Sequence, residues 1–271
     1  MKRKILVEKN RFYKRVLIDP LTTKTVTEII PDRPVKKPQD RIKRDNVPQL
    51  KPQKVEVGKE PNRIRDKSSY KNLGKIDPIF KGSSIFIVGG GPSLKDFDFT
   101  RLKDKHVIAV NKAFLFVPFA DVMYWTDTRF YKWYEKEINL FSGLKVTNKS
   151  TPIKPGIVNL QDTGREGLET RPDGIRHGNN SGYAAINLAY LLGANKIILL
   201  GFDMKIEGKK THFHDGYSTP QNPKIYENNM VPYFKTLVDP LKSHGVEIYN
   251  ACPDSALTCF KKCTIEEVMR F

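Results

Sequence analysis

Cysteine is scarce in this chain: its 271 residues include only three, Cys252, Cys259 and Cys263. An odd number of thiols at these spacings matches neither a disulfide framework nor a zinc-binding pattern. We therefore expect a protein of a reducing compartment, the cytoplasm, with no disulfide bonds and no metal site built from cysteine.

Long apolar runs are also missing. No segment approaches the roughly 18 consecutive apolar residues that mark a membrane-spanning helix. The basic beginning, MKRKILVEKN, is not followed by the apolar core of about 7–15 residues that a signal peptide needs. We expect a protein with no membrane span and no secretion signal.

Acidic residues are sparse in the first third of the chain. Of the net charge of +17, residues 1–82 contribute +13, with 23 Lys and Arg against 10 Asp and Glu, and residues 83–271 contribute +4, with 24 against 20. Such a basic segment is typical of proteins that contact nucleic acid or another polyanion. A solvated arm without a partner is the alternative. We expect any contact with a polyanion to involve residues 1–78.

The composition of residues 31–78 predicts little packing. Proline, lysine and arginine are abundant there and apolar residues are few, so the segment cannot bury enough surface to offset its ordering entropy. Before it, FYKRVLIDPLTTKTVTEII has the pattern of a short hairpin with a turn near Asp19 and Pro20. We interpret residues 1–82 as a basic, Pro-rich, largely extended arm.

From residue 83 the pattern changes to apolar runs separated by helical stretches. The predicted strands are apolar on both faces, as in a parallel sheet covered on each side; they fall at 85–88, 106–111, 121–127, 196–203 and 246–251. Predicted helices cover 128–138, 181–193 and 225–245, the last divided by Pro232 and Pro240. The alternation predicts an α/β, Rossmann-like domain over residues 83–271, with helices on both faces of the sheet.

The stretch SSIFIVGGGPSLKDF (83–97) contains a possible phosphate-binding loop at the end of a predicted strand. Glycines permit close approach and positive φ, a proline suits the first helical turn, and a serine can cap the helix or donate to a phosphate; the residues are Gly89, Gly90, Gly91, Pro92 and Ser93. No Walker A lysine follows, and the third glycine of a dinucleotide fingerprint is Leu94. A tight turn without a ligand is equally compatible with this loop.

Other strand ends are also polar. Asn111 ends one predicted strand, Thr126 and Asp127 end the next, and Asp203 ends a third. In a parallel sheet these residues meet at the same edge as the glycine loop. Each one alone is a common turn former or helix cap. Their recurrence over three strand ends favours a binding site.

Two further segments carry candidate residues. HGNNSGYAA (177–185) begins a helix, where Asn180 or Ser181 can cap and the N–H groups near Gly182 can hold an anion or a hydroxyl group; a plain cap is the alternative. KKTHFHDGY (209–217) places His212 and His214 beside Asp215. These residues suit a general base or a weak metal-ligand set, and a surface loop is the alternative.

The motifs IVGGGPSL, AVNKAF, SGYAAINLAYLLGANKIILLGFD and VEIYNACPDSAL resemble, in this order, those of glycosyltransferase family 42, the bacterial sialyltransferases. The related GPSL-loop, pterin-diphosphokinase-like family is also similar, and such domains occur in uncharacterised bacteriophage proteins. The resemblance covers residues 83–271. It implies a cytoplasmic enzyme of a bacterium or phage-infected cell with a Rossmann-like domain that binds a CMP-sugar and requires no metal.

The resemblance also implies roles for single residues. The nucleotide would contact the loop from Gly89 to Leu94, Asn111, the strand end near Thr126 and Asp127, the helix start at Ser181 and Gly182, and Gly201 and Asp203. Gly90 replaces the asparagine of the family loop. The family's phosphate-supporting tyrosine falls near Met204 and Lys205, so Lys205 would neutralise the leaving phosphate. His212 or His214 would take the place of the catalytic histidine.

Three functions are compatible with these residues. The first is a nucleotide-sugar-dependent glycosyltransferase, in which His214 or His212 deprotonates an acceptor hydroxyl, possibly that of DNA or a glycan, and Lys205 stabilises the departing phosphate. The second is a pyrophosphokinase-like enzyme that uses ATP and Mg²⁺ near Asp127, Asp203 or Asp215. The third is a non-catalytic binding protein, phage- or nucleic-acid-associated, whose basic arm is the functional part. An oligomer is compatible with each.

Overall fold

The computed structural model describes residues 12–18, 25–31, 74–148, 155–206, 212–213 and 223–271. The chain divides into two compact units, residues 1–60 and 61–271. In the first unit, β1 (Phe12–Ile18) pairs antiparallel with β2 (Thr25–Pro31). The predicted hairpin is therefore present, whereas its turn at Asp19 and Pro20 and the greater part of the basic arm lie outside the described residues.

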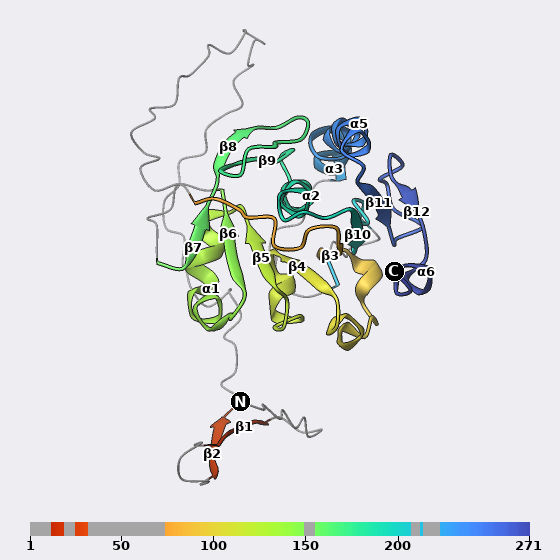
Figure 1. The fold of residues 1–271 in the computed structure, drawn as a ribbon. Helices are drawn as coiled ribbons and strands as arrows, with labels where there is room; N and C mark the ends of the chain where they lie inside the picture. Colours follow the sequence, from red (N-terminus) through yellow and green to blue (C-terminus); the bar gives the residue numbers. More distant parts are fainter. Residues whose placement is uncertain (1–11, 19–24, 32–73, 149–154, 207–211, 214–222) are drawn as a thin grey trace, which may run out of the picture. The chain divides into compact units, whose positions relative to one another are not determined.

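The second unit is built on an eight-stranded sheet in the order β12-β11-β10-β3-β4-β5-β6-β7 (Figure 1). Every neighbouring pair in it is parallel. The strands are β3 (Ser84–Val88), β4 (His106–Val110), β5 (Val122–Trp125), β6 (Leu144–Thr147), β7 (Ile157–Asn159), β10 (Lys196–Leu200), β11 (Glu247–Asn250) and β12 (Lys261–Lys262). A separate parallel pair consists of β8 (Gln161–Gly164) and β9 (Gly174–Arg176). The prediction of a Rossmann-like parallel sheet is confirmed.

Helices cover both faces of the sheet (Figure 1). One face carries α2 (Ser181–Leu191) and a segment that is divided, as predicted, into α3 (Pro223–Asn229), α4 (Val231–Phe234), η6 (Lys235–Leu237) and α5 (Val238–Ser243). Pro232 and Pro240 lie in the first turns of α4 and α5. The other face carries α1 (Thr128–Leu140), α6 (Ile265–Val268) and three short 3₁₀ helices, η3 (Pro92–Leu94), η4 (Phe99–Leu102) and η5 (Asn111–Leu115).

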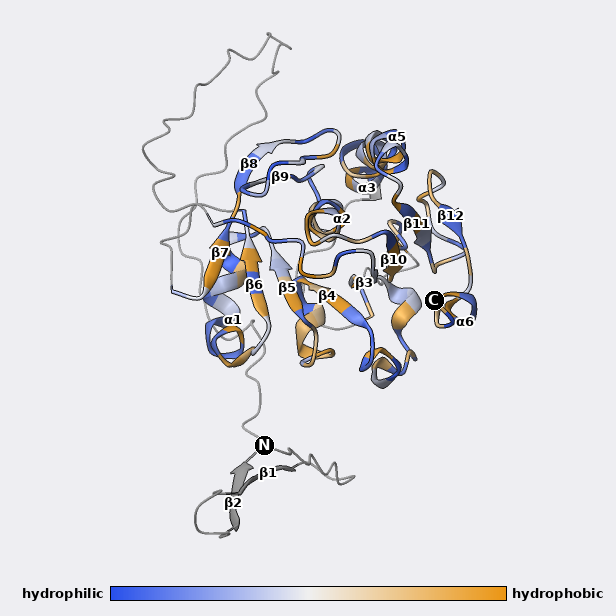
Figure 2. Cartoon of the chain, in the orientation of Figure 1, coloured by the Kyte–Doolittle hydropathy of each residue, from blue (hydrophilic) through white to orange (hydrophobic). Residues whose placement is uncertain are grey.

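Alternate residues of each central strand pack into different layers, because successive side chains of a strand point to opposite faces. In β3, Ile85 and Ile87 join the core under α2, whereas Phe86 and Val88 join the core under α1. In Figure 2 the strands β4, β6 and β7 are largely hydrophobic and α1 has one hydrophobic and one hydrophilic side. The apolar strand runs of the sequence therefore reflect burial on both faces.

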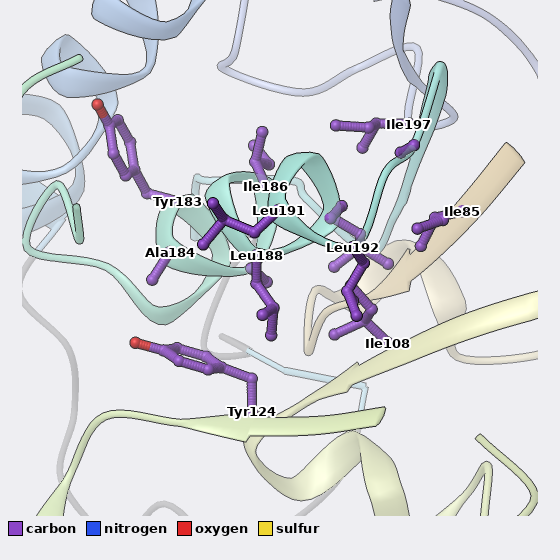
Figure 3. Packing of buried hydrophobic residues seen from close by; sticks show 14 of the residues in the cluster. Ile85, Ile108, Tyr124, Tyr183, Ala184, Ile186, Leu188, Leu191, Leu192 and Ile197 are labelled. Carbon is purple, nitrogen blue, oxygen red and sulfur yellow. The ribbon is translucent and has the colours of Figure 1, made fainter. Parts of the chain in front are cut away.

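Helix α2 is the centre of one of these layers. All of its residues except Ser181 and Tyr190 are buried, as expected for a helix that is apolar all round. Figure 3 shows Leu188 and Leu192 pointing toward the sheet residues Tyr124 and Ile108. The rigid packing of α2 on the sheet fixes the position of its first turn at the carboxyl edge of the strands.

Residues 74–82, which the sequence placed in the arm, pack against the sheet and helices of the second unit, to which they belong. The backbone N–H of Gly74 donates to the carbonyl of Asn159 at 3.0 Å, and that of Ile76 donates to the carbonyl of Pro172 at 2.8 Å. The side chain of Ile76 is buried in the core under α2. Over the described part of the chain, no helix is long and apolar enough to cross a membrane.

Candidate functional site

The point where the chain reverses its direction across the sheet lies between β3 and β10. From β3 the strands proceed through β4, β5, β6 and β7 on one side, and β10, β11 and β12 lie on the other side. Val88 and Leu200, the last residues of β3 and β10, are paired in register. Open α/β sheets bind ligands at the carboxyl ends of the strands at such a point. The glycine loop and the segment Gly201–Asp203 follow these two strands directly.

A pocket of about 110 Å³ opens at this position. It brings together most of the predicted site residues, which come from five separate segments of the chain. Its lining consists of Gly89, Gly90, Gly91, Val110, Asn111, Asn180, Ser181, Gly182, Gly201, Phe202, Asp203, Met204, Lys205, His212 and Tyr226. Five predicted residues do not line it, namely Pro92, Ser93, Leu94, Thr126 and Asp127, and His214 and Asp215 lie outside the described residues.

Asp203 occupies the place at the glycine loop where an external anion was expected. The Ser93 backbone N–H donates to Oδ1 of Asp203 at 3.0 Å, and the Ser93 hydroxyl donates to Oδ2 at 2.8 Å. The Asp203 residue is only 3% exposed. Ser93, which the sequence predicted either to cap a helix or to donate to a phosphate, thus donates through its N–H and its hydroxyl to a carboxylate of the protein itself.

The same carboxylate explains the glycine at position 91. A Cβ atom on Gly91 would overlap the side chain of Asp203 and lie 2.6 Å from the carbonyl oxygen of Gly201. The Gly91 N–H donates to that carbonyl at 2.8 Å. The element that follows is η3, a 3₁₀ helix of three residues, and not the longer helix whose N-terminus the sequence suggested. The loop is therefore shaped primarily by its contact with the end of β10.

The opposite wall of the pocket is the start of α2. Oδ1 of Asn180 accepts the N–H groups of Gly182 and Tyr183 at 2.7 and 3.1 Å, so Asn180 is the N-cap. The hydroxyl of Ser181 donates to Oγ1 of Thr126 at 3.1 Å. Two first-turn N–H groups of α2 are thus satisfied by the cap, and Ser181 is one of the residues that line the pocket.

The ends of β4 and β5 differ in their relation to the pocket. Asn111 lines the pocket with a φ of 51°, a left-handed conformation that asparagine tolerates better than most residues. Asp127 instead caps α1, accepting the Arg129 N–H at 2.8 Å, and forms an ion pair with the Arg129 guanidinium at 2.6 Å. The structure therefore places Asp127 in a helix cap, which was the alternative that the sequence left open.

His212 and Lys205 supply the basic groups of the pocket. Burial, together with the positive charge of Lys112, lowers the pKa of His212 from 6.5 to about 4, so its imidazole is neutral at neutral pH. Phe213, the residue after His212, holds His212 at the pocket through two contacts. The Phe213 N–H donates to the carbonyl of Gly90 at 3.0 Å, and the Phe213 ring lies 4.8 Å from that of Phe116.

Three contributors were not predicted from the sequence. Lys112 follows Asn111 directly and was overlooked beside it. Tyr226 of α3 lines the pocket, and its pKa is raised by burial and by the charge of Asp203. Burial and the charge of Asp203 also raise the pKa of the buried thiol of Cys252 to about 11. Of these three, only Lys112 could have been predicted from the sequence, because it directly follows Asn111 at a polar strand end.

The described part of the chain contains no group of three or more His, Cys, Asp or Glu residues placed to hold a metal ion. Comparisons of the chain with protein-family models, with curated proteins and with solved structures give no match. The fold and the pocket thus define the chain as an α/β protein with a parallel sheet and a polar pocket at the switch point of that sheet.

Proposed function

We propose that the chain is a nucleotide-sugar-dependent glycosyltransferase that needs no metal ion. The observation that carries this proposal is the meeting of Lys205, His212 and the Ser181 hydroxyl with two backbone loops in one pocket at the switch point. These groups supply what the reaction needs: a cation for a phosphate, a neutral imidazole for a proton, and polar donors for a sugar or ribose. A pocket of this kind is the default binding site of an α/β sheet.

The phosphate of the donor binds chiefly to side chains in this proposal. The Ser93 donors are held by Asp203, and Asn180 satisfies two N–H groups at the start of α2. Lys205 lines the pocket and supplies the positive charge for the phosphate oxygens, whereas the Ser181 hydroxyl donates to Thr126. A lysine acts there as a compact point charge and not as a bidentate fork.

His212 is the general base of the proposed reaction. Its neutral form accepts the proton of the acceptor hydroxyl while the acceptor oxygen bonds to the anomeric carbon. The bond from that carbon to the phosphate oxygen breaks, and the phosphate leaves with the electron pair, stabilised by Lys205. A bound phosphate raises the pKa of His212 from its low value near 4, because a nearby negative charge favours the imidazolium form. The donor thus makes the base more effective.

The magnesium-dependent alternative receives no specific support from the two described carboxylates that it requires. Asp203 accepts two hydrogen bonds from Ser93, and Asp127 is paired with Arg129. The third carboxylate, Asp215, lies outside the described residues. A metal requirement remains an outcome that the following experiment distinguishes.

The test is a thermal-shift screen with CMP, UDP, GDP and ATP, with and without Mg²⁺, followed by measurement of CMP release from a CMP-sugar. A ligand that binds only the folded protein raises the melting temperature. We expect CMP to do so without Mg²⁺, Lys205→Ala to weaken its binding, and His212→Gln to abolish CMP release while binding is retained. Lys242→Ala, on the exposed side of α5, is the matched control. Stabilisation by ATP with Mg²⁺ alone, or by no nucleotide, would contradict the proposal.

A further inference from the structure

A groove of about 400 Å³ lies at the end of α2 that is opposite the pocket. The last residues of α2 and the turn after it (190–194) form it together with residues from 76–81, 170–172 and 244–246. The pocket is lined by the start of α2, and no residue lines both cavities. Because α2 has 11 residues, the two cavities are separated by a helix about 16 Å long. The groove is therefore a separate site.

The turn after α2 gives the groove one of its walls. Gly193 has a φ of 96°, a conformation that favours glycine, and a Cβ atom there would lie 2.8 Å from Cα of Lys81. The Gly82 N–H donates to the carbonyl of Gly193 at 2.8 Å. The segment that carries Lys81 is thus held directly against the end of α2.

The floor of the groove is apolar. Ile76, Leu191, Ala194 and Val246 line the groove, each is at most 8% exposed, and all four belong to the core under α2. The lining residues Lys81, Thr170 and His244 are exposed. An apolar group that lies on such a floor is removed from water, which contributes about 25 cal/mol for each Å² of apolar surface buried.

The polar side chains of the groove are cationic or can donate a hydrogen bond. They are Lys81, Thr170, Tyr190 and His244, and among the described residues no Asp or Glu lines the groove. The Tyr190 hydroxyl lies 3.2 Å from Nδ1 of His244, so Nε2 is the ring nitrogen available to a ligand. Within the described part of the chain, the Lys81 ammonium forms no hydrogen bond or ion pair.

We infer that the groove binds an amphipathic carboxylate, a small molecule with an aliphatic body and one carboxylate group. The body lies on the buried floor, and the carboxylate accepts a charge-assisted hydrogen bond from Lys81. A cationic ligand, the Lys- and Arg-rich arm included, would meet the charge of Lys81 without a carboxylate in the described lining to offset it. This binding is independent of the proposed transferase reaction, because the groove shares no residue with the pocket.

The experiment compares octanoate, 1-octanol and octylammonium, which have the same apolar body and different charges, by NMR of the full chain at neutral pH. The reporters are the methyl signals of Ile76, Ala194 and Val246 in the groove and of Met204 in the pocket. We expect octanoate to shift the groove signals and to leave Met204 unchanged. We expect 1-octanol to bind about tenfold more weakly, the effect of one lost charge-assisted hydrogen bond, and octylammonium to bind more weakly still.

Two lysine variants test the role of the charge. Lys81→Met removes the charge and keeps an apolar stem, so it should weaken octanoate binding about tenfold and leave 1-octanol binding unchanged. Lys75→Met is the matched control, because Lys75 is an exposed residue of the same segment that does not line the groove; it should bind both ligands as the parent does. Thermal melts of both variants should match the parent, since each change is at an exposed side chain.

Three results would overturn the inference. The first is that octanoate shifts no groove signal, and the second is that octylammonium binds as tightly as octanoate. The third is that Lys81→Met binds octanoate as the parent does. Saturation with CMP should not displace octanoate, and failure of CMP to bind would count against the proposed transferase and not against the groove.

Discussion

Ser93 and Asp203, 110 residues apart in the chain, are joined by two hydrogen bonds that use both oxygens of the same carboxylate. The pair ties the loop after β3 to the end of β10 at the switch point of the sheet. Glycine-rich loops often present their N–H groups to a bound phosphate. In this chain an internal anion satisfies the Ser93 donors, so the loop has a defined shape before any ligand binds.

The first prediction concerns the energy of this pair. Asp203→Ala removes both hydrogen bonds that Ser93 donates. It should lower the free energy of unfolding by about 1.5–3 kcal/mol, the contribution of one hydrogen bond to a charged group, because Ser93 is exposed and water can replace the lost carboxylate. Ser93→Ala should cost about 1–2 kcal/mol because one N–H bond remains. Urea unfolding of the two single variants and the double variant should reveal a coupling energy above about 1 kcal/mol. Additive effects would show that the two residues act independently.

The second prediction concerns the pH dependence of stability. The pKa of His212 is about 4 in the folded chain, against an ordinary value of 6.5, so between these pH values the unfolded chain binds a proton that the folded chain does not. Stability should therefore fall as the pH drops from about 6.5 to 4, by at most about 3 kcal/mol. Above pH 6.5 the residue should contribute no pH dependence.

Urea unfolding between pH 4 and pH 7.5 tests this effect. His212→Gln should remove this part of the pH dependence. Lys112→Gln should reduce it only partly, because burial is the larger cause of the lowered pKa and the charge of Lys112 the smaller one. If the free energy of unfolding changes with pH equally in the parent and in His212→Gln, the fold does not hold His212 in its neutral form.

The third prediction concerns the reactivity of the thiol groups. Cys252 is buried and its pKa is raised to about 11 by burial and by the charge of Asp203, whereas Cys259 and Cys263 are partly exposed. Since the thiolate is the reactive form, iodoacetamide at pH 8 should modify Cys252 last. Asp203→Asn should accelerate the reaction of Cys252 by removing the neighbouring charge. Peptide mass spectrometry gives the order, and early modification of Cys252 in the folded parent would contradict it.

The sheet and most of the pocket could be predicted because their signals are local. An apolar run followed by Gly, Asn or Asp marks a buried strand and its carboxyl end, and parallel strands place these ends together. The alternatives at Asn180 and Asp127 remained open because helix capping and ligand binding require the same residue types. The structure resolves both residues as caps, although Asn180 also lines the pocket.

The contacts between distant segments could not be predicted. The sequence gives no sign that Asp203 rather than a phosphate accepts the hydrogen bonds of Ser93, since both groups are anions. Tyr226 reaches the pocket through the packing of α3 and belongs to no motif. The position of His212 at the pocket depends on the anchoring of Phe213 to Gly90, a contact that the pattern of alternating residues does not contain, whereas His214 lies outside the described residues.

The last prediction concerns the basic arm, for which the structure determines where to cut. Residues 1–73 contain 21 Lys and Arg against 9 Asp and Glu, whereas Gly74 and Ile76 are bonded to the sheet unit and Ile76 is buried. The full chain should bind duplex DNA with an affinity that falls steeply with salt, with a slope of about −0.9 for each phosphate contacted. The chain of residues 74–271 should lose this binding and retain CMP binding and its melting temperature. A cut after residue 78 should lower stability by about 2–5 kcal/mol through the loss of Ile76. Equal DNA binding by residues 74–271 would assign the polyanion contact to the sheet unit.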